Sequence, residues 1–201
     1  MNKGQVRVIS SKSDAHRSLI AAALAEEESV LFVDGWSDDL EATIRCLEAL
    51  GAEIYKEPSG IEVVPNGRNL DKAAVLDCGE SGSTLRFMLP IAGALGVDAT
   101  FVMEARLPER PLSPLWEEME RMGCTLSFLD SSSLHCTGKL RCGEYFIDGS
   151  ISSQFISGLL FAAALIPGES KITITGTSES KSYISMTQSA MELFGIHCHN
   201  F

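Results

Sequence analysis

The chain has 201 residues, of which 45% are hydrophobic and 21% are charged, and its 16 Lys and Arg against 27 Asp and Glu give a formal net charge of -11. This acidic charge excludes a general role on nucleic acid or on a membrane surface, because both need a basic face. The composition is that of a globular chain with a sizeable core, not that of a disordered one.

Three copies of one pattern occur along the chain, in which a helix ends, a glycine follows and a strand begins. The glycines are Gly51, Gly123 and Gly195, and they are 72 residues apart both times. Glycine at this place is typical of a left-handed helix C-cap. Before each glycine the sequence predicts a helix that is apolar on nearly all sides, then a short β-rich run, then an amphipathic helix.

The expected elements follow one another in chain order. The first repeat has an apolar helix, a strand, an amphipathic helix and a second strand, expected at 17–25, 29–35, 38–50 and 60–65. The second repeat has the same four elements at 84–96, 99–105, 112–122 and 125–130. The third repeat has the first three elements at 154–166, 170–176 and 184–194. Helices without a polar face are buried. We therefore expect one α/β domain of three pseudo-threefold repeats with buried helices inside and sheets outside, at about 10–75, 76–145 and 146–201, the last one truncated.

A polar cluster precedes each of the three apolar helices. Ser13, Gly82 and Ser153 lie in these clusters, 38, 41 and 42 residues before the repeat glycines. Related repeats would bring three helix N-termini, with their free backbone N–H groups, to one place. Hydroxyl groups with Lys12, Arg17 and Arg86 would add donors, so we expect a site for a strongly anionic small molecule.

Each cluster taken singly also has an ordinary explanation. Ser, Thr and Asp before a helix are most often N-caps. Arg110, which lies in a loop stiffened by two prolines, is interpreted either as a surface arginine or as a ligand contact. His16 is interpreted as a polar group at a helix entry and receives no catalytic role.

Nothing in the sequence predicts a membrane segment, a disulfide framework or a metal site. The chain does not open on a signal sequence, and its longest apolar run, 155–166, is too short to cross a bilayer, so we expect a cytoplasmic protein. The six cysteines contain no CxxC pair, which favours reduced thiols. The terminal HCHNF is interpreted as a strand with His197 and His199 outward and Cys198 inward, not as a metal motif.

Five ordered segments resemble the successive signatures of the 5-enolpyruvylshikimate-3-phosphate synthase family. They are SKSDAHRSLIAAALA, CGESGSTLRFMLP, LPERPLSPL, DGSISSQFISGLLFAAALIPG and SKSYISMT. The resemblance covers nearly the whole chain and implies an enolpyruvyl transferase-like fold. It implies transfer of the enolpyruvyl group from phosphoenolpyruvate to the 5-hydroxyl of 3-phosphoshikimate in the shikimate pathway of aromatic amino acid biosynthesis. The implied enzyme is a glyphosate target and uses no metal or organic cofactor.

The resemblance also implies roles for individual residues, among which Lys12 is the catalytic one and contacts both substrates. The residues implied for 3-phosphoshikimate are Lys12, Ser13, Arg17, Ser152, Ser153, Ser180 and Tyr183. The residues implied for phosphoenolpyruvate are Lys12, Gly82, Arg110 and Gln154. We expect the three Ser residues at 152, 153 and 180 to line one pocket, with Lys12 and Arg17 at its rim.

The chain departs from the family pattern in two segments. Glu80 and Ser81 replace the commoner asparagine and alanine of their loop, although Gly82 is kept, and Phe87 and Ser182 stand where proline is frequent. We expect the differences at 80, 81 and 87 to tune inhibitor sensitivity.

The family fold has a second domain of three further repeats, and this chain stops at Phe201, where the last strands of the third repeat should begin. We therefore expect a phosphoshikimate-binding half, either an excised fragment or a truncated product. Its missing partner is the second domain, and by itself it should bind 3-phosphoshikimate without turnover.

Two alternatives remain open. A UDP-N-acetylglucosamine enolpyruvyl transferase would carry Lys-Asn at positions 12 and 13 and a cysteine in the loop at 107–111, and this chain has neither. The second alternative is a non-catalytic anion-binding module.

Overall fold

The computed structural model describes residues 5–7, 12–33, 35–57, 60–65, 73–176 and 181–198. Its helices are α1 (Lys12–Leu24), α2 (Asp38–Ala49), α3 (Gly82–Leu95), α4 (Leu115–Arg121), α5 (Ser153–Leu165) and α6 (Lys181–Leu193), with a 3-10 turn η1 (Leu107–Glu109). Its strands are β1 (Gln5–Arg7), β2 (Ser29–Phe32), β3 (Glu53–Glu57), β4 (Gly60–Val64), β5 (Ala73–Asp77), β6 (Asp98–Val102), β7 (Cys124–Phe128), β8 (Ser133–Gly138), β9 (Gly143–Asp148) and β10 (Ser170–Thr175).

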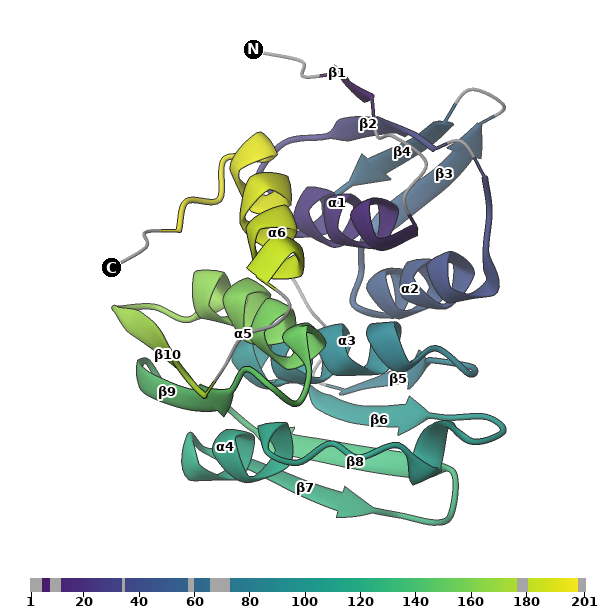
Figure 1. Cartoon of the computed structure of the whole chain (residues 1–201). Helices are drawn as coiled ribbons and strands as arrows, with labels where there is room; N and C mark the ends of the chain where they lie inside the picture. The colour runs from purple at the N-terminus through teal and green to yellow at the C-terminus, as the bar shows by residue number, and fades with distance from the viewer. Residues whose placement is uncertain are drawn as a thin grey trace.

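The strands form three sheets that lie outside a group of helices (Figure 1). Two sheets have four strands each, in the orders β1-β2-β4-β3 and β5-β6-β8-β7. In both, the first strand is parallel to the second and the remaining neighbours are antiparallel. The third sheet is the parallel pair β9 and β10, with Gly143 opposite Ser170. The expected α/β architecture with sheets outside is therefore confirmed, while the boundaries of the three repeats stay a prediction.

Five helices contact one another in a closed ring. The neighbours in this ring are α1 and α2, α2 and α3, α3 and α5, α5 and α6, and α6 and α1. The sequence expectation of buried helices holds best for α3, in which 11 of 14 residues are buried. Because such a helix has no polar face, it needs apolar neighbours on all sides, and the ring together with the outer sheets provides them.

The α3 and α5 helices approach so closely that one position accepts only glycine. A Cβ on Gly158 would lie 2.4 Å from the backbone oxygen of Arg86 and 2.9 Å from the Pro90 ring. Beside this contact, the rings of Phe87 and Phe161 pack edge to face with their centroids 6.2 Å apart. The two helices therefore hold their N-termini in a fixed relation.

The amphipathic helices and their terminal glycines follow the predicted pattern with one shorter helix. Gly51, Gly123 and Gly195 all have positive φ, at 87°, 116° and 77°. The helix expected at 112–122 is only Leu115–Arg121, because the chain enters it from a proline-containing turn and Pro114 stands before its first residue.

The C-terminal segment differs from its prediction. Residues 196–198 form no strand. His197 is exposed as expected, and the Cys198 thiol lies 3.9 Å from the Met191 sulfur, on the edge of the core. His199 lies outside the described residues. The six cysteines are free thiols, and within the described ranges we find no helix with the length and apolarity that a membrane span requires.

Candidate functional site

A cavity of about 520 Å³ opens where α1, α3 and α5 begin. It is lined by Lys12, Ser13, His16, Arg17, Asp39, Gly82, Ser83, Phe87, Arg110, Ile151, Ser152, Ser153, Gln154 and Tyr183. These residues come from five helices and two loops that are far apart in the sequence. Nine of the ten site residues predicted from the sequence are among them, and the tenth, Ser180, lies outside the described residues.

The three helix N-termini meet at this cavity as the repeat phase predicted. Gly82 and Ser153 are the first residues of α3 and α5, and Ser13 is the second residue of α1. The Ser152 hydroxyl accepts a hydrogen bond from the Gln154 backbone N–H at 3.2 Å and so caps α5. The capping explanation is therefore correct for Ser152, which also faces the cavity. Free N–H groups at three helix starts make this a place where an anion is favoured.

Arg17 lies in the floor of the cavity and not at its rim, which corrects the sequence expectation. Its side chain is buried, and only 2% of its surface is exposed. Nε donates to Thr187 Oγ1 at 2.7 Å, Nη1 to the Ser13 backbone oxygen at 2.9 Å and Nη2 to Ser157 Oγ at 3.2 Å. Burial lowers the pKa of Arg17 to about 10, so the guanidinium stays charged at neutral pH. It joins α1, α5 and α6 while carrying positive charge to the site.

Two aromatic rings enclose the Arg17 guanidinium. Its central carbon lies 5.0 Å from the centroid of Phe87 and 5.6 Å from that of Tyr183. Both distances suit cation-π attraction, which favours the charged form. Phe87, one of the departures from the family pattern, is therefore a buried residue that lines the site. Tyr183 lines the same site but is half-exposed.

Arg86 does not line the cavity, contrary to the expectation that it would add a donor there. Its Nη1 donates to Gln154 Oε1 at 2.7 Å and its Nη2 to the Pro111 backbone oxygen at 3.3 Å. Burial and the nearby charge of Arg110 lower its pKa. Arg86 therefore positions the Gln154 amide and the loop that carries Arg110.

Arg110 is exposed and also lines the cavity, so its role as a ligand contact stays a prediction. A Cβ on Gly82 would stand 2.7 Å from Arg110 Nη1. The glycine at the start of α3 therefore leaves the space that the guanidinium occupies. The sequence motif identified both residues but not their contact.

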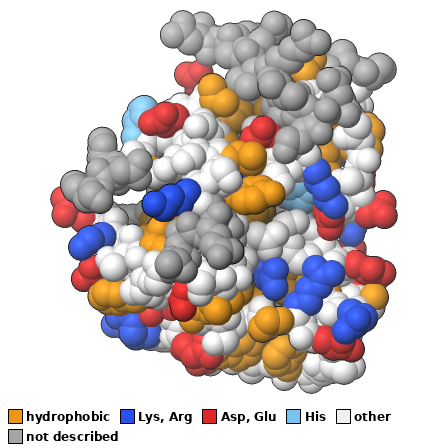
Figure 2. Space-filling view, in the orientation of Figure 1, with side chains coloured by type: hydrophobic (Ala, Val, Ile, Leu, Met, Phe, Trp, Pro, Cys, Tyr) orange, Lys and Arg blue, Asp and Glu red, His pale blue; other side chains and the backbone are white. Residues whose placement is uncertain are grey.

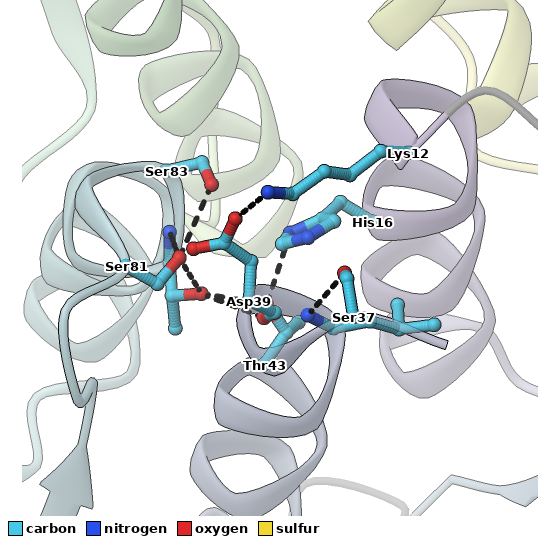
Figure 3. A network of polar contacts seen from close by, with 9 residues as sticks. Lys12, His16, Ser37, Asp39, Thr43, Ser81 and Ser83 are labelled. Atoms are coloured by element: carbon cyan, nitrogen blue, oxygen red, sulfur yellow. Dashed lines mark hydrogen bonds and ion pairs between the residues drawn. The ribbon is translucent and has the colours of Figure 1, made fainter. Parts of the chain in front are cut away.

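Lys12 is half-exposed at the mouth of the cavity, where its ammonium forms an ion pair with Asp39 (Figure 3). Asp39 was not among the site residues predicted from the sequence. It lies in the first turn of α2 with Asp38 and Glu41, and acidic residues are ordinary there because they complement the helix dipole. No sequence signal separated Asp39 from its neighbours.

His16 was also missed as a cavity residue. The residue is 2% exposed, and its Nδ1 lies 3.0 Å from Thr43 Oγ1. Burial, reinforced by the positive charges of Lys12 and Arg17, lowers its pKa to about 4. His16 is therefore neutral at pH 7. Figure 3 shows it between Lys12 and Thr43, at the junction of α1 and α2.

The charges of the cavity oppose those of the whole protein. Lys12, Arg17 and Arg110 provide three positive charges against the one negative charge of Asp39, in a chain of net charge -11. Figure 2 shows Lys and Arg side chains gathered near a partly covered His, while acidic side chains spread over the rest of this face. Among the described residues, no three His, Cys, Asp or Glu side chains come together as a metal ligand set. The arrangement suits a small polyanion.

Comparison with known proteins gives one consistent result. The family model described as EPSP synthase (3-phosphoshikimate 1-carboxyvinyltransferase) matches residues 2–200. A 3-phosphoshikimate 1-carboxyvinyltransferase of Clostridium botulinum (strain Eklund 17B / Type B) is 42% identical over 204 residues, which cover 98% of this chain and 47% of the relative. One of Clostridium beijerinckii is 41% identical over 205 residues, with the same two coverages. The chain thus spans about half the length of the curated relatives it matches.

The solved structures agree in fold. An EPSP synthase structure from Acinetobacter baumannii superposes with a TM-score of 0.74 at 23% identity, covering 91% of this chain and 42% of that one. The expected enolpyruvyl transferase-like fold is thereby confirmed.

Proposed function

The chain belongs to the EPSP synthase (3-phosphoshikimate 1-carboxyvinyltransferase) family, and from this premise we propose that it is the 3-phosphoshikimate-binding half of a cytoplasmic enolpyruvyl transferase. The complete enzyme would transfer the enolpyruvyl group of phosphoenolpyruvate to the 5-hydroxyl of 3-phosphoshikimate by addition and then elimination of phosphate. The names of the relatives favour this over the UDP-N-acetylglucosamine enzyme.

One observation carries the proposal: three helix N-termini and three cationic side chains converge on one cavity of about 520 Å³. Both substrates are polyanions, so bringing them together costs electrostatic free energy unless fixed charges and N–H donors offset it. A site that is already organised in the free protein supplies those groups without further rearrangement.

On the 3-phosphoshikimate side, the hydroxyls of Ser152 and Ser153 at the start of α5, which line the cavity, are proposed to donate to the phosphate group. Arg17 contributes its charge from the floor, and Ser13 lies beside it at the start of α1. Ser180, for which the family motif implies a third hydroxyl, completes this set in the proposal. Tyr183 would pack its ring against the carbocycle, since its outer face is exposed.

On the phosphoenolpyruvate side, Arg110 and Gln154 are proposed to hold the smaller anion next to the Gly82 backbone. Lys12 lies at the mouth of the cavity and would reach both substrates, in exchange for its contact with Asp39. It is the proposed catalytic residue. The chain covers 47% of its relatives, and we propose that a second domain supplies the remaining cations and the acid-base carboxylates. No metal or organic cofactor is part of the proposal.

Titration calorimetry with 3-phosphoshikimate tests this function. The proposal expects saturable one-to-one binding at pH 7.5 and much weaker binding of shikimate, which lacks the phosphate. A chain that bound inorganic phosphate as tightly as 3-phosphoshikimate would instead be a general anion-binding module, the remaining alternative.

A further inference from the structure

The Nε2 atom of His16 is buried and has no hydrogen-bond partner within the described part of the chain. Buried polar atoms in folded proteins are nearly always paired with protein, water or ligand. His16 is 2% exposed and is one of the residues that line the cavity. Because His16 lines the cavity, a bound ligand can supply the partner that this ring nitrogen lacks.

The hydrogen bonds around Thr43 indicate which tautomer His16 adopts. The Thr43 hydroxyl lies 3.1 Å from the Asp39 backbone oxygen, 2.8 Å from Thr84 Oγ1 and 3.0 Å from His16 Nδ1. It has one proton to donate and can accept two. If Nδ1 carries the imidazole proton, Thr43 donates to the Asp39 oxygen and accepts from His16 and Thr84, so all three contacts are hydrogen bonds. If Nε2 carries it, Thr43 must donate to Nδ1 and loses the bond to the Asp39 oxygen.

The first arrangement satisfies more contacts, and it leaves Nε2 as an acceptor. The other acceptors for a ligand hydroxyl in this cavity are the serine hydroxyls, the Asp39 carboxylate that pairs with Lys12 and the Gln154 oxygen that already accepts from Arg86. The other charged groups, Arg17 and Arg110, can only donate.

We propose that His16 Nε2 accepts a hydrogen bond from a hydroxyl group of the ligand, and that it thereby selects a hydroxylated phosphate ester over a bare phosphate or carboxylate. The inference rests on the proposed function and deepens it, since nothing in the family signature gave His16 a role. Thr43 and, through it, Thr84 hold the ring, so α1, α2 and α3 together orient the acceptor (Figure 3).

The tautomer is measured on the wild-type chain with 15N-labelled histidine. At pH 7 the proposal expects the proton of His16 on Nδ1, with Nε2 resonating as an unprotonated nitrogen. Addition of 3-phosphoshikimate should move the Nε2 resonance in the direction of an accepted hydrogen bond, and inorganic phosphate should leave it in place. A proton found on Nε2, or the same response to both ligands, overturns the inference.

Two variants separate ligand contact from structural support. His16→Asn keeps a polar atom near the Nδ1 position for Thr43 and removes Nε2, whereas His16→Gln places its amide near Nε2. His16→Asn should weaken 3-phosphoshikimate binding about three- to tenfold, the range of one net hydrogen bond, and His16→Gln by less than about twofold. The matched control, His135→Asn on β8, removes a histidine that pairs with Asp98 outside the cavity.

The ranking of the variants decides between the outcomes. If His16→Gln binds worse than His16→Asn, the Nδ1 contact matters and the role is structural, which overturns the inference. If the wild-type chain and His16→Asn bind 3-phosphoshikimate equally well, the inference about His16 is overturned while the proposed function stands. If the wild-type chain binds no 3-phosphoshikimate, the proposed function is overturned, and the inference about His16 is overturned as well.

Discussion

Gly82 and Arg110 are in such close contact that a methyl group on residue 82 would stand 2.7 Å from the Arg110 guanidinium. The obstructing atom is the far end of a flexible side chain, which can move at little cost. Gly158 offers the contrast, because its missing methyl would meet the Arg86 backbone oxygen at 2.4 Å.

Gly82→Ala should therefore leave the fold intact and displace Arg110, whereas Gly158→Ala should force α3 and α5 apart. We expect the free energy of unfolding to change by less than about 0.5 kcal/mol in the first variant and to fall by about 1–3 kcal/mol in the second. Urea denaturation of both variants measures this difference. Equal losses would mean that the contact of α3 with α5 is no tighter than that of Gly82 with Arg110.

The two serines at the start of α5 should separate ligand binding from helix capping. Ser153→Ala removes a cavity hydroxyl that makes no hydrogen bond within the described structure, and should weaken 3-phosphoshikimate binding by about 1–2 kcal/mol, the scale of a bond to a charged group. Ser152→Ala also removes the α5 cap and should cost about 1 kcal/mol of stability. Calorimetry and urea denaturation are run on each variant. Unchanged affinity in Ser153→Ala would contradict its assigned contact.

Asp39 should limit how strongly the cavity attracts anions. Asp39→Asn removes the negative charge that pairs with Lys12 and should tighten 3-phosphoshikimate binding about three- to tenfold at low ionic strength. Asp38→Asn is the matched control, because it removes the same charge from the first turn of α2 at a residue that does not line the cavity. Equal changes of the dissociation constant in the two variants would contradict a specific role of the Asp39 charge.

Burial of His16 should make the fold sensitive to mild acid. Its pKa is lowered from 6.5 to about 4 in the folded chain, so between these values the unfolded state binds the proton and the folded state does not. The stabilisation is present above pH 6.5 and is lost as the pH falls toward 4, by about 3 kcal/mol in total. Urea denaturation between pH 4 and 8 should show a smaller loss over this window in His16→Asn than in the wild-type chain. Parallel curves would contradict the buried neutral imidazole.

Much of the fold was predictable because its signals are local. The spacing of Gly51, Gly123 and Gly195 revealed a repeat, and the apolar surfaces of three helices placed them inside. The strands β1, β5, β8 and β9 were not among the expected elements. The strand expected in the terminal HCHNF rested on alternating residues, of which 197 and 198 follow the end of α6 as irregular chain. Alternation over so few residues does not determine whether a strand has a neighbour to pair with.

The site was predictable where a residue carries a motif and not where its role depends on a distant partner. Ser13, Gly82 and Ser153 were found from their common phase. Asp39 and His16 were missed, since the ion pair of Asp39 and the hydrogen bond of His16 join helices that are remote in sequence. The predicted position of Arg17 at the rim was wrong for the same reason. Arg17 is buried because it donates to Ser157 and Thr187, which lie on helices that are remote in sequence and near only in the fold.

Binding and turnover should be separable in this chain. With 3-phosphoshikimate and phosphoenolpyruvate both present, a phosphate-release assay should give no more phosphate than either substrate alone. The reason is that the proposed acid-base carboxylates lie in a second domain. Release that required both substrates would refute the division of roles between the two halves.

The most direct test of the account is a thermal melt of the 201-residue chain with 3-phosphoshikimate. At about a hundred times its dissociation constant, this ligand should stabilise the fold by about 2.7 kcal/mol and raise the melting temperature, whereas phosphoenolpyruvate or glyphosate alone should raise it little. A melting temperature that did not respond to 3-phosphoshikimate, or that rose equally with phosphoenolpyruvate, would contradict the claim that this cavity is the 3-phosphoshikimate site.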